Sequence, residues 1–277
     1  YIRNYMPHKI YGQYIAYMFQ TPTTRVWKEM YDAGKLNDAK STFWETKAPE
    51  ELYDLQNDPD EVVNLATSKD HQKILRRLRR AQEKVAVEIG DLGFLPENEI
   101  HTRDYGNPPY TMGHDRWLYD LKEIKKMAEL ASSLDPKDVR RLKRGFNHKD
   151  SAARYWAAMG ILMRGEPAVV DAREGLLALL QDPEPAPRIA AAEALGRYGG
   201  DADADLALDT LVELAPVDEN GPYVSMLALN AIDAMGMRAK TKEAEIAALP
   251  RTAAGVPGKF KAYIPNLLES IHKNLNP

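Results

Sequence analysis

The chain has 277 residues, of which 44% are hydrophobic and 28% charged, a balance typical of ordinary folded proteins and long enough for two domains. No apolar run approaches the roughly 18 residues of a spanning helix, and a net charge of −4 argues against general nucleic-acid binding, so neither a membrane nor a nucleic-acid partner is expected. The absence of cysteine excludes disulfides and cysteine-ligated metals.

The first segment, residues 1–48, predicts a strand over residues 1–7 and then two short helices. Apolar and aromatic residues, including Tyr14, recur at near-helical spacing from residue 12 to residue 34, and Pro22 divides them. A strand that begins at Tyr1 needs neighbouring strands, and the sequence offers few. We therefore expect that the chain is a fragment whose N-terminal part is missing.

Residues 49–68 predict a strand, a capped helical turn and the start of a long helix. Leu52, Tyr53 and Leu55 suit a short strand, and Asp58 fits the N-cap of a turn in which Glu61 is the reciprocal capping-box acid. The helix that follows Ser68 carries an apolar stripe and is expected to end at Gly90. This stripe comprises Ile74, Leu75, Leu78, Ala81, Val85 and Ile89.

Residues 93–115 have no hydrophobic period and are rich in Gly, Pro, Tyr and His, so they predict a long loop or linker that includes Tyr105. Beyond Arg116 the sequence is helical throughout. We expect Trp117, together with Leu121 and Ile124, on the apolar face of the first of these helices.

A repeat follows within the helical half. The segment from Asp150 through Arg154 to two alanines recurs from Asp182 through Arg188, and the two arginines are 34 residues apart. This period suits stacked helix pairs. The pattern resembles HEAT repeats, and that resemblance implies that these four residues form a ladder between successive repeats. A weaker copy near residue 231 lacks the ladder residues, and an amphipathic helix over 258–275 suits a terminal cap.

The block Glu-Leu-Tyr-Asp-Leu, Asp-Pro-Asp-Glu and Asn-Leu-Ala within residues 51–66 resembles the C-terminal region of the type I, formylglycine-dependent sulfatases. The likeness is strongest to bacterial heparan N-sulfatase-like enzymes and covers roughly residues 1–103. Together with the composition of the linker and the HEAT-like repeats, it implies a mainly helical protein, with a small α+β sulfatase C-terminal subdomain over 1–92, a linker over 93–115 and a HEAT-like α-α solenoid over 116–277. It also implies a periplasmic or secreted location.

The family's catalytic segment is Cys or Ser, any residue, Pro, any residue, Arg, and its first residue becomes formylglycine beside a calcium ion. This chain has no Cys and no Pro with Ser two positions earlier, so it cannot supply the nucleophile. Calcium and formylglycine are therefore implied for a parent enzyme, and no cofactor is expected in this chain. The missing N-terminal sulfatase domain is then its first expected partner.

Two candidate binding surfaces remain. The loop with His8, Lys9, Tyr11 and Gln13 corresponds, by the resemblance, to the mouth of the sulfatase active site, where it would contact a sulfated sugar; the alternative is a turn with solvated side chains. Arg140, Arg141, Lys143 and Arg144 would form a patch for an acidic polysaccharide, although a solvated helix face is the preferred explanation.

No metal site is expected. His101 and His114, near Asp104 and Asp115, suit turn caps, and Asp201, Asp203 and Asp205 lack the Gly and Glu of a calcium loop. Two functions follow from these patterns. The chain is either the non-catalytic C-terminal part of a sulfatase for sulfated glycans, supplying packing and one wall of the substrate cleft, or a free-standing HEAT-repeat module that binds a protein.

Overall fold

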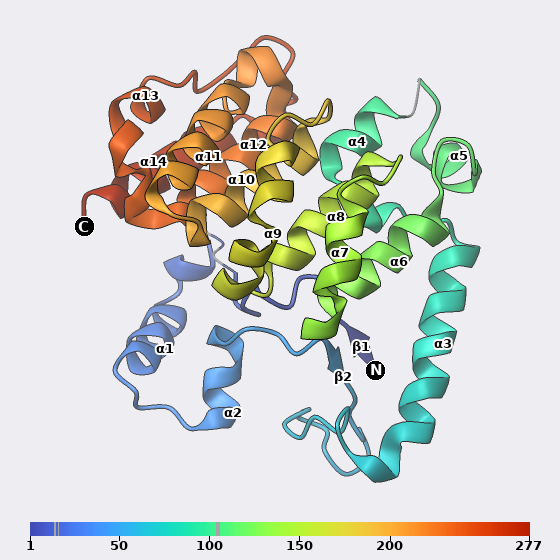
Figure 1. The fold of residues 1–277 in the computed structure, drawn as a ribbon. Coiled ribbons are helices and arrows are strands. Elements are labelled where there is room, and N and C mark those ends of the chain that lie inside the picture. Colours follow the sequence, from blue (N-terminus) through green and yellow to red (C-terminus); the bar gives the residue numbers. More distant parts are fainter. Residues whose placement is uncertain (14, 16, 104–105) are drawn as a thin grey trace. The chain divides into compact units, whose positions relative to one another are not determined.

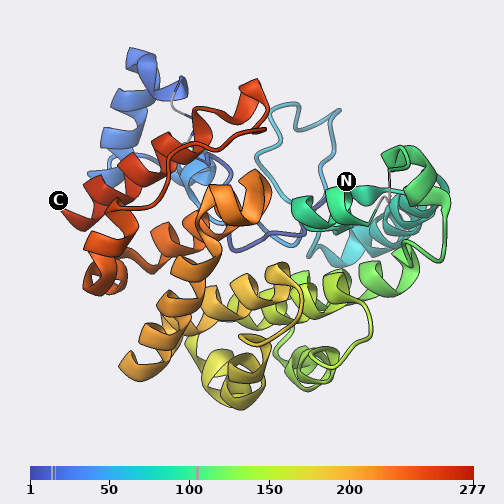
Figure 2. The ribbon, with the colours of Figure 1, turned by 90° about the horizontal axis from the view of Figure 1, so that it is seen from above.

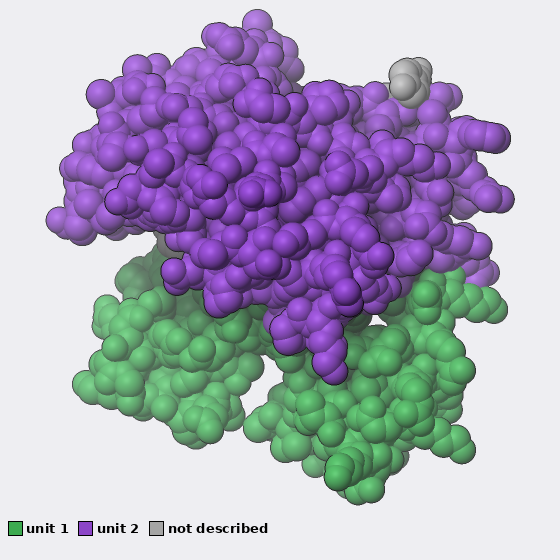
Figure 3. All heavy atoms as spheres, in the orientation of Figure 1, with its two compact units in different colours: residues 1–86 green, residues 87–277 purple. Residues whose placement is uncertain are grey.

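The computed structural model describes residues 1–13, 15, 17–103 and 106–277; Tyr14, Asp104 and Tyr105 lie outside the described residues. The chain is mainly helical, as the sequence predicts, and divides into two compact units, Tyr1–Ala86 and Val87–Pro277. Figure 1 traces the elements in chain order, and Figure 3 colours the two units separately.

In its described part, the first unit contains one small antiparallel sheet, three α-helices and short 3-10 turns. The strands β1 (Ile2–Arg3) and β2 (Glu50–Glu51) pair with Ile2 opposite Glu51 and Arg3 opposite Glu50. The first strand therefore has a partner within the chain, and it is shorter than predicted. The helices are α1 (Pro22–Asp32), α2 (Asp38–Ser41) and α3 (Gln72–Glu88).

Aromatic side chains hold the first half of this unit together. The ring of Trp27 in α1 stacks on Phe43 at 4.7 Å between centroids and meets the edge of Trp44 at 5.3 Å. The Trp27 indole also donates to the backbone oxygen of Lys40 at 2.9 Å, which satisfies its polar atom. Pro22 stands at the start of α1, where a missing N–H costs nothing, so the predicted division of the helices at Pro22 is confirmed.

The segment after β2 differs from the prediction. The strand lies at Glu50–Glu51 rather than at 52–55, and the capped helical turn at 58–61 is absent. The carboxylate of Asp58 instead accepts from the backbone nitrogens of Val62 at 3.0 Å and Val63 at 2.8 Å. Glu61 has a φ of 53°, which a helical turn does not allow. Asp58 therefore closes a wider loop, and the predicted capping box is wrong.

The second unit consists of short helices followed by stacked helix pairs. The segment predicted as an aperiodic linker carries α4 (Glu97–Thr102) and α5 (Pro109–His114). The following helices are α6 (Leu121–Ser132), α7 (Val139–Gly145), α8 (Ser151–Leu162), α9 (Glu166–Leu179), α10 (Pro185–Tyr198), α11 (Asp201–Leu214), α12 (Val217–Met235), α13 (Glu243–Ala247) and α14 (Tyr263–Leu275).

The pairs stack in two layers, as a solenoid requires. In one layer α6, α8, α10, α12 and α14 pack successively against one another, and α7, α9 and α11 each pack against the neighbouring helices of that layer. Seen from above, the helices from α6 to α14 follow a curved path (Figure 2). The helix α14 packs against α12 and contributes buried Ile264, Leu268, Ile271 and Leu275 to the stack.

Small residues allow the close approach of these helices. A Cβ added to Gly160 in α8 would lie 2.7 Å from the Leu142 side chain and 2.8 Å from the Ala131 backbone. The alanines at 190–192 and 194 in α10 are buried in the same way. Small side chains at the contact reduce the distance between helix axes, so the Ala-rich stretches build the core of the solenoid.

Trp117 is the main departure in this half. It is 98% exposed because α6 begins only at Leu121, after Asp120 has accepted the backbone nitrogen of Glu123. The predicted apolar face is therefore shorter than expected and starts after Trp117. No helix within the described ranges has the length and apolarity needed to cross a membrane.

Candidate functional site

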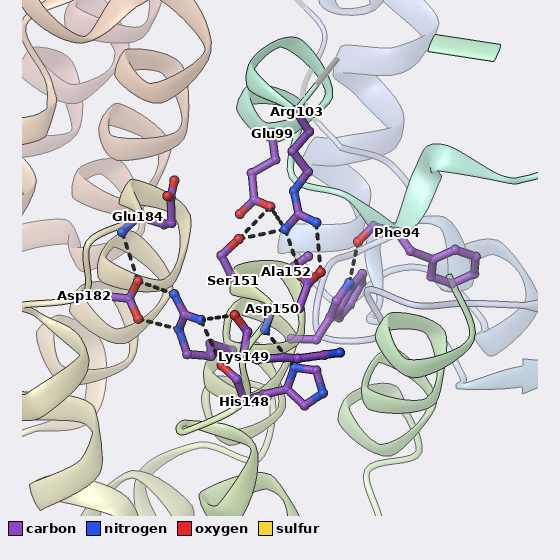
Figure 4. Close-up of polar contacts among 12 residues, drawn as sticks. Phe94, Glu99, Arg103, His148, Lys149, Asp150, Ser151, Ala152, Asp182 and Glu184 are labelled. Carbon is purple, nitrogen blue, oxygen red and sulfur yellow. Dashed lines mark hydrogen bonds and ion pairs between the residues drawn. The ribbon is translucent and has the colours of Figure 1, made fainter. Parts of the chain in front are cut away.

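A network of charged groups links α4 to the start of α8 (Figure 4). Arg103 at the C-terminal end of α4 donates through Nη1 to Asp150 Oδ2 at 2.9 Å and through Nη2 to Asp150 Oδ1 at 2.8 Å. Arg103 also reaches Ser151 Oγ at 2.7 Å and the carboxylate of Glu99. Asp150 caps α8 by accepting the backbone nitrogen of Ala152 at 2.9 Å. A single guanidinium therefore joins two carboxylates and a helix start.

Glu99 is the most buried charged group of this network, with 1% of its surface exposed. Its Oε2 accepts from Ser151 Oγ at 2.9 Å, whereas Oε1 has no hydrogen-bond partner among the described residues. Burial raises the pKa of Glu99, and the opposing charge of Arg103 does not fully offset this. Burial is the largest single influence on Asp150 and would raise its pKa, but the hydrogen bonds and the charge of Arg103, together with the backbone hydrogen bond from Ala152, lower that pKa on balance.

Replacing Glu99 with glutamine should change the pH dependence of stability. Folding raises the pKa of Glu99, so this side chain contributes to the free energy of unfolding in its protonated form. That contribution is complete below the ordinary carboxyl pKa and is lost as the pH rises through the pKa of the folded state. Glu99→Gln removes this titration, so the free energy of unfolding of the wild type should fall relative to that of the variant from pH 4 to pH 8. Urea unfolding across this range measures the difference in free energy of unfolding between the wild type and the variant. A difference that does not change with pH would contradict a raised pKa of Glu99.

The network continues along the solenoid as a series of Arg–carboxylate pairs. Arg154 in α8 forms a two-pronged pair with Asp182, with Nε–Oδ2 at 2.6 Å and Nη2–Oδ1 at 2.7 Å, and both side chains are largely buried. Arg188 in α10 reaches Glu213 at 2.9 Å, where the carboxylate is exposed. Each arginine thus pairs with a carboxylate further along the chain, and Asp150 receives Arg103 from the segment predicted as a linker.

Two further arginines of the solenoid were missed by the sequence reasoning. Arg173 in α9 pairs with Asp203 in α11 through two contacts of 2.6 Å, and Asp203 had been considered only as part of a calcium loop. Arg164 donates to the backbone oxygens of Leu130 and Ala131 at the end of α6, at 2.9 and 2.8 Å. The pair of Arg173 could have been found from the Arg–Asp spacing of 30 residues, which is close to the repeat period. The bonds of Arg164 to backbone oxygens have no such signature in the sequence.

The predicted basic patch on α7 is partly neutralised. Arg141 pairs with Asp138 at 3.0 Å, and Lys143 reaches the backbone oxygen of Asp171 at 2.7 Å and its carboxylate at 3.2 Å. Arg140 and Arg144 are exposed and form no ion pair with the described residues. Two of the four cations therefore already have a carboxylate neighbour, and their value to a polyanion is correspondingly reduced.

The predicted glycan-contacting loop belongs to the first unit. The Tyr11 hydroxyl donates to Glu51 Oε1 at 2.7 Å, and burial together with Glu51 raises the pKa of Tyr11 to about 12. Both ring nitrogens of His8 are buried, Lys9 is half-buried and Gln13 is exposed. The four side chains therefore lie in different surroundings, and the Tyr11 hydroxyl is already used within the unit.

Glu51 is the centre of a second buried network that the sequence did not indicate. It is 3% exposed and accepts from Asn4 Nδ2 at 2.5 Å and from the hydroxyls of Tyr11 and Tyr53 at 2.7 Å each. These donors come from three separate points of the chain. Their convergence on one carboxylate fixes the loop of residues 4–11 against β2.

The remaining polar residues of this block satisfy their own backbone. Asn64 Oδ1 accepts from the backbone nitrogens of Leu52 at 3.1 Å and Ala66 at 2.9 Å, and its Nδ2 donates to the oxygen of Glu50 at 3.1 Å. Glu50 in turn pairs with Arg79 of α3 at 2.6 Å. These contacts give the Asn-Leu-Ala and Glu-Leu-Tyr segments a structural role.

Within the described residues, no three His, Cys, Asp or Glu side chains are grouped as metal ligands. The most deeply buried acids described here bind donors of the chain itself. Asp203 pairs with an arginine, and Glu51 accepts from an amide and two hydroxyls, whereas Glu99 keeps one oxygen without a partner. The arrangement can hold the fold together and offer charge to a partner.

Two comparisons with known proteins give a match. Residues 139–233 match the family model for HEAT repeats. These residues form HEAT-like repeats. A stretch of 101 residues is 38% identical to an ulvan-active sulfatase of Formosa agariphila, covering 36% of this chain. This chain spans only 17% of the length of that sulfatase. No solved structure matches this chain.

Proposed function

We propose that this chain is the non-catalytic C-terminal region of a sulfatase that acts on a sulfated polysaccharide. The observation that carries this proposal is the 38% identity over 101 residues to a sulfatase active on ulvan. The Glu-Leu-Tyr-Asp-Leu and Asn-Leu-Ala segments, which resemble the C-terminal region of such enzymes, here build a compact self-bonded block. A periplasmic or secreted location belongs to the same proposal.

The small core of the first unit supports a larger parent. Among its described residues, the buried hydrophobic side chains are Trp44, Leu52, Leu75 and Ala86. Several large apolar side chains of the same unit are exposed instead, notably Val26, Met30, Leu55, Val62, Val63, Ile74 and Val85. A segment of this size with so few buried side chains is poorly stabilised alone. Its exposed apolar groups are suited to packing against a catalytic domain.

The residues of this chain do not fit the cofactors of a type I sulfatase. Formylglycine requires a Cys or Ser in a Cys/Ser-x-Pro-x-Arg segment, which the sequence lacks, and no acidic cluster of the described residues suits calcium. Both groups would have to come from the rest of the parent enzyme. The part assigned to this chain is structural support and one wall of the substrate cleft, to which exposed Gln13 and half-buried Lys9 would contribute.

The second candidate is a HEAT-repeat module whose partner is a protein. The match of residues 139–233 to the HEAT family favours it, because stacked helix pairs present an extended surface to partners. Under this reading the sulfatase-like block would serve only to support the solenoid.

One experiment separates these functions. The complete natural gene product that contains this sequence should hold a Cys/Ser-x-Pro-x-Arg segment and should release inorganic sulfate from ulvan, measured by ion chromatography. Alanine at the first position of that segment should abolish release, and the 277-residue chain alone should release none. A gene product without the segment would favour the binding module. Sulfate release by the 277-residue chain itself would overturn its non-catalytic assignment.

A further inference from the structure

A small pocket lies between α4 and α12. Its volume is about 170 Å³, and its lining combines two amides, a carboxylate, an aromatic ring and two apolar side chains. The lining residues are Glu97, Asn98, Tyr223, Met226, Leu227 and Asn230. Pockets for drug-sized ligands measure about 300–1,000 Å³, so this pocket suits a single small ring.

Asn98 is the unusual residue of this lining. Its side chain is 6% exposed, yet its Oδ1 forms no hydrogen bond with the described residues. A buried amide oxygen without a donor is destabilising, and nearly all such groups in folded proteins have a partner. Oδ1 has almost no accessible surface in this conformation, so a rotation of the Asn98 side chain would present it to an incoming hydrogen-bond donor.

The other polar groups of the pocket also offer acceptors. Asn230 donates through Nδ2 to the backbone oxygen of Met226 at 2.7 Å, which leaves its Oδ1 for a ligand. The carboxylate of Glu97 is largely exposed and lies 3.6 Å from His101 Nε2. No lysine or arginine lines the pocket, so an anionic group would meet a carboxylate without a compensating cation.

The aromatic wall is held in place before any ligand arrives. Tyr223 stacks on His101 with centroids 4.2 Å apart and rings inclined by 13°, and it meets Phe260 at 5.3 Å and 74°. Gly221, with a φ of 74°, introduces the kink in α12 two residues before Tyr223. A wall fixed in this way loses little entropy when a ligand binds.

We propose that this pocket binds one uncharged pyranose ring of a polysaccharide. Hydroxyl groups would donate to Asn98, Asn230 and Glu97, while the C–H face of the ring would contact Tyr223, Met226 and Leu227. The choice of a saccharide rests on the proposed function, whereas the preference for a neutral ring follows from the lining. A sulfate ester would be excluded by Glu97, so the pocket would hold an unsulfated unit of the chain.

The methyl group of Met226 provides a probe inside the pocket. The 277-residue chain, labelled with [methyl-¹³C]methionine, is titrated separately with the neutral methyl pyranosides of glucose, xylose and rhamnose, with glucose 6-sulfate, and with lysine methyl ester. We expect at least one neutral glycoside to shift the Met226 signal saturably, with a Kd on the order of millimolar for so small a contact. Glucose 6-sulfate should bind more weakly than methyl glucoside.

Variants connect the signal to the pocket. Asn98→Ala should weaken binding about five-fold by removing one hydrogen bond, and Asn230→Trp, at an exposed position, should abolish it by filling the pocket. Asn147→Ala removes an exposed amide elsewhere and should leave binding unchanged. Absence of any saturable shift, retained binding in folded Asn230→Trp, or binding of lysine methyl ester alone would overturn the proposal.

The outcome is independent of sulfate release by the parent. Glycoside binding without sulfate release from the complete gene product would remove the sulfatase assignment and retain the pocket. Sulfate release without glycoside binding would retain the sulfatase assignment and remove the proposed binding site.

Discussion

Replacing Arg103 with alanine is expected to destabilise the chain by about 4 kcal/mol, because it leaves two buried carboxylates without their shared cation. Arg103 holds Asp150 through two hydrogen bonds and also contacts Ser151 and Glu99. After its removal, Glu99 and Asp150 would repel each other across Ser151 in a site largely shielded from solvent. Urea unfolding followed by circular dichroism measures the loss in free energy.

The same variant should regain stability when its carboxylates are neutralised. Adding Glu99→Gln to Arg103→Ala should recover part of the loss, since one of the two unpaired charges is then absent. Arg144→Ala provides the matched control, because Arg144 is an exposed arginine without an ion pair among the described residues, and its effect should stay within about 0.5 kcal/mol. If Arg103→Ala and Arg144→Ala reduced the free energy of unfolding equally, the network would make no special contribution to stability.

Asp182→Asn should cost about 3 kcal/mol by breaking the central pair of the solenoid. The substitution keeps the size of the side chain and an oxygen for the backbone nitrogen of Glu184, which Asp182 Oδ1 accepts at 2.9 Å. It removes the charge that faces Arg154, whose guanidinium would then lie largely buried without a counterion. The midpoint of urea unfolding should fall accordingly, with an unchanged slope.

Asp171→Asn tests whether burial is the cause of that effect. Asp171 also pairs with a cation, Lys143 at 3.2 Å, but both side chains are exposed to solvent. Exposed pairs contribute at most about 1 kcal/mol, so this variant should lose far less than Asp182→Asn. If both aspartates had the same effect on the free energy of unfolding, the buried pair would have no special role.

The block around residues 50–66 shows how far sequence patterns reach. Asp58, Pro59 and Glu61 have the types and spacing of a helix start, yet Asp58 caps a loop that ends at Val63. Short capping patterns fit several local conformations, and contacts elsewhere select among them. The convergence of Asn4, Tyr11 and Tyr53 on Glu51 was equally invisible, since these donors are scattered over fifty residues.

The solenoid was easier to predict from the sequence. Periodic alanines and leucines predicted its helices, and the repeat spacing predicted their stacking, because each helix pair must bury its apolar face against the next. The partners in the ion pairs could not be predicted from the sequence. Asp150 could have paired with any nearby cation, and only the position of α4 brings Arg103 to it.

The amino-acid sequence by itself determined the helical class, the repeats and the absence of a formylglycine segment. These features depend on periodicity and residue type, which are local properties of the chain. Only the tertiary structure decided which arginine meets which carboxylate, that Glu99 and Asn98 are buried with an open oxygen each, and that Trp117 is exposed. Such facts depend on distances between segments far apart in sequence, and those distances are set by packing.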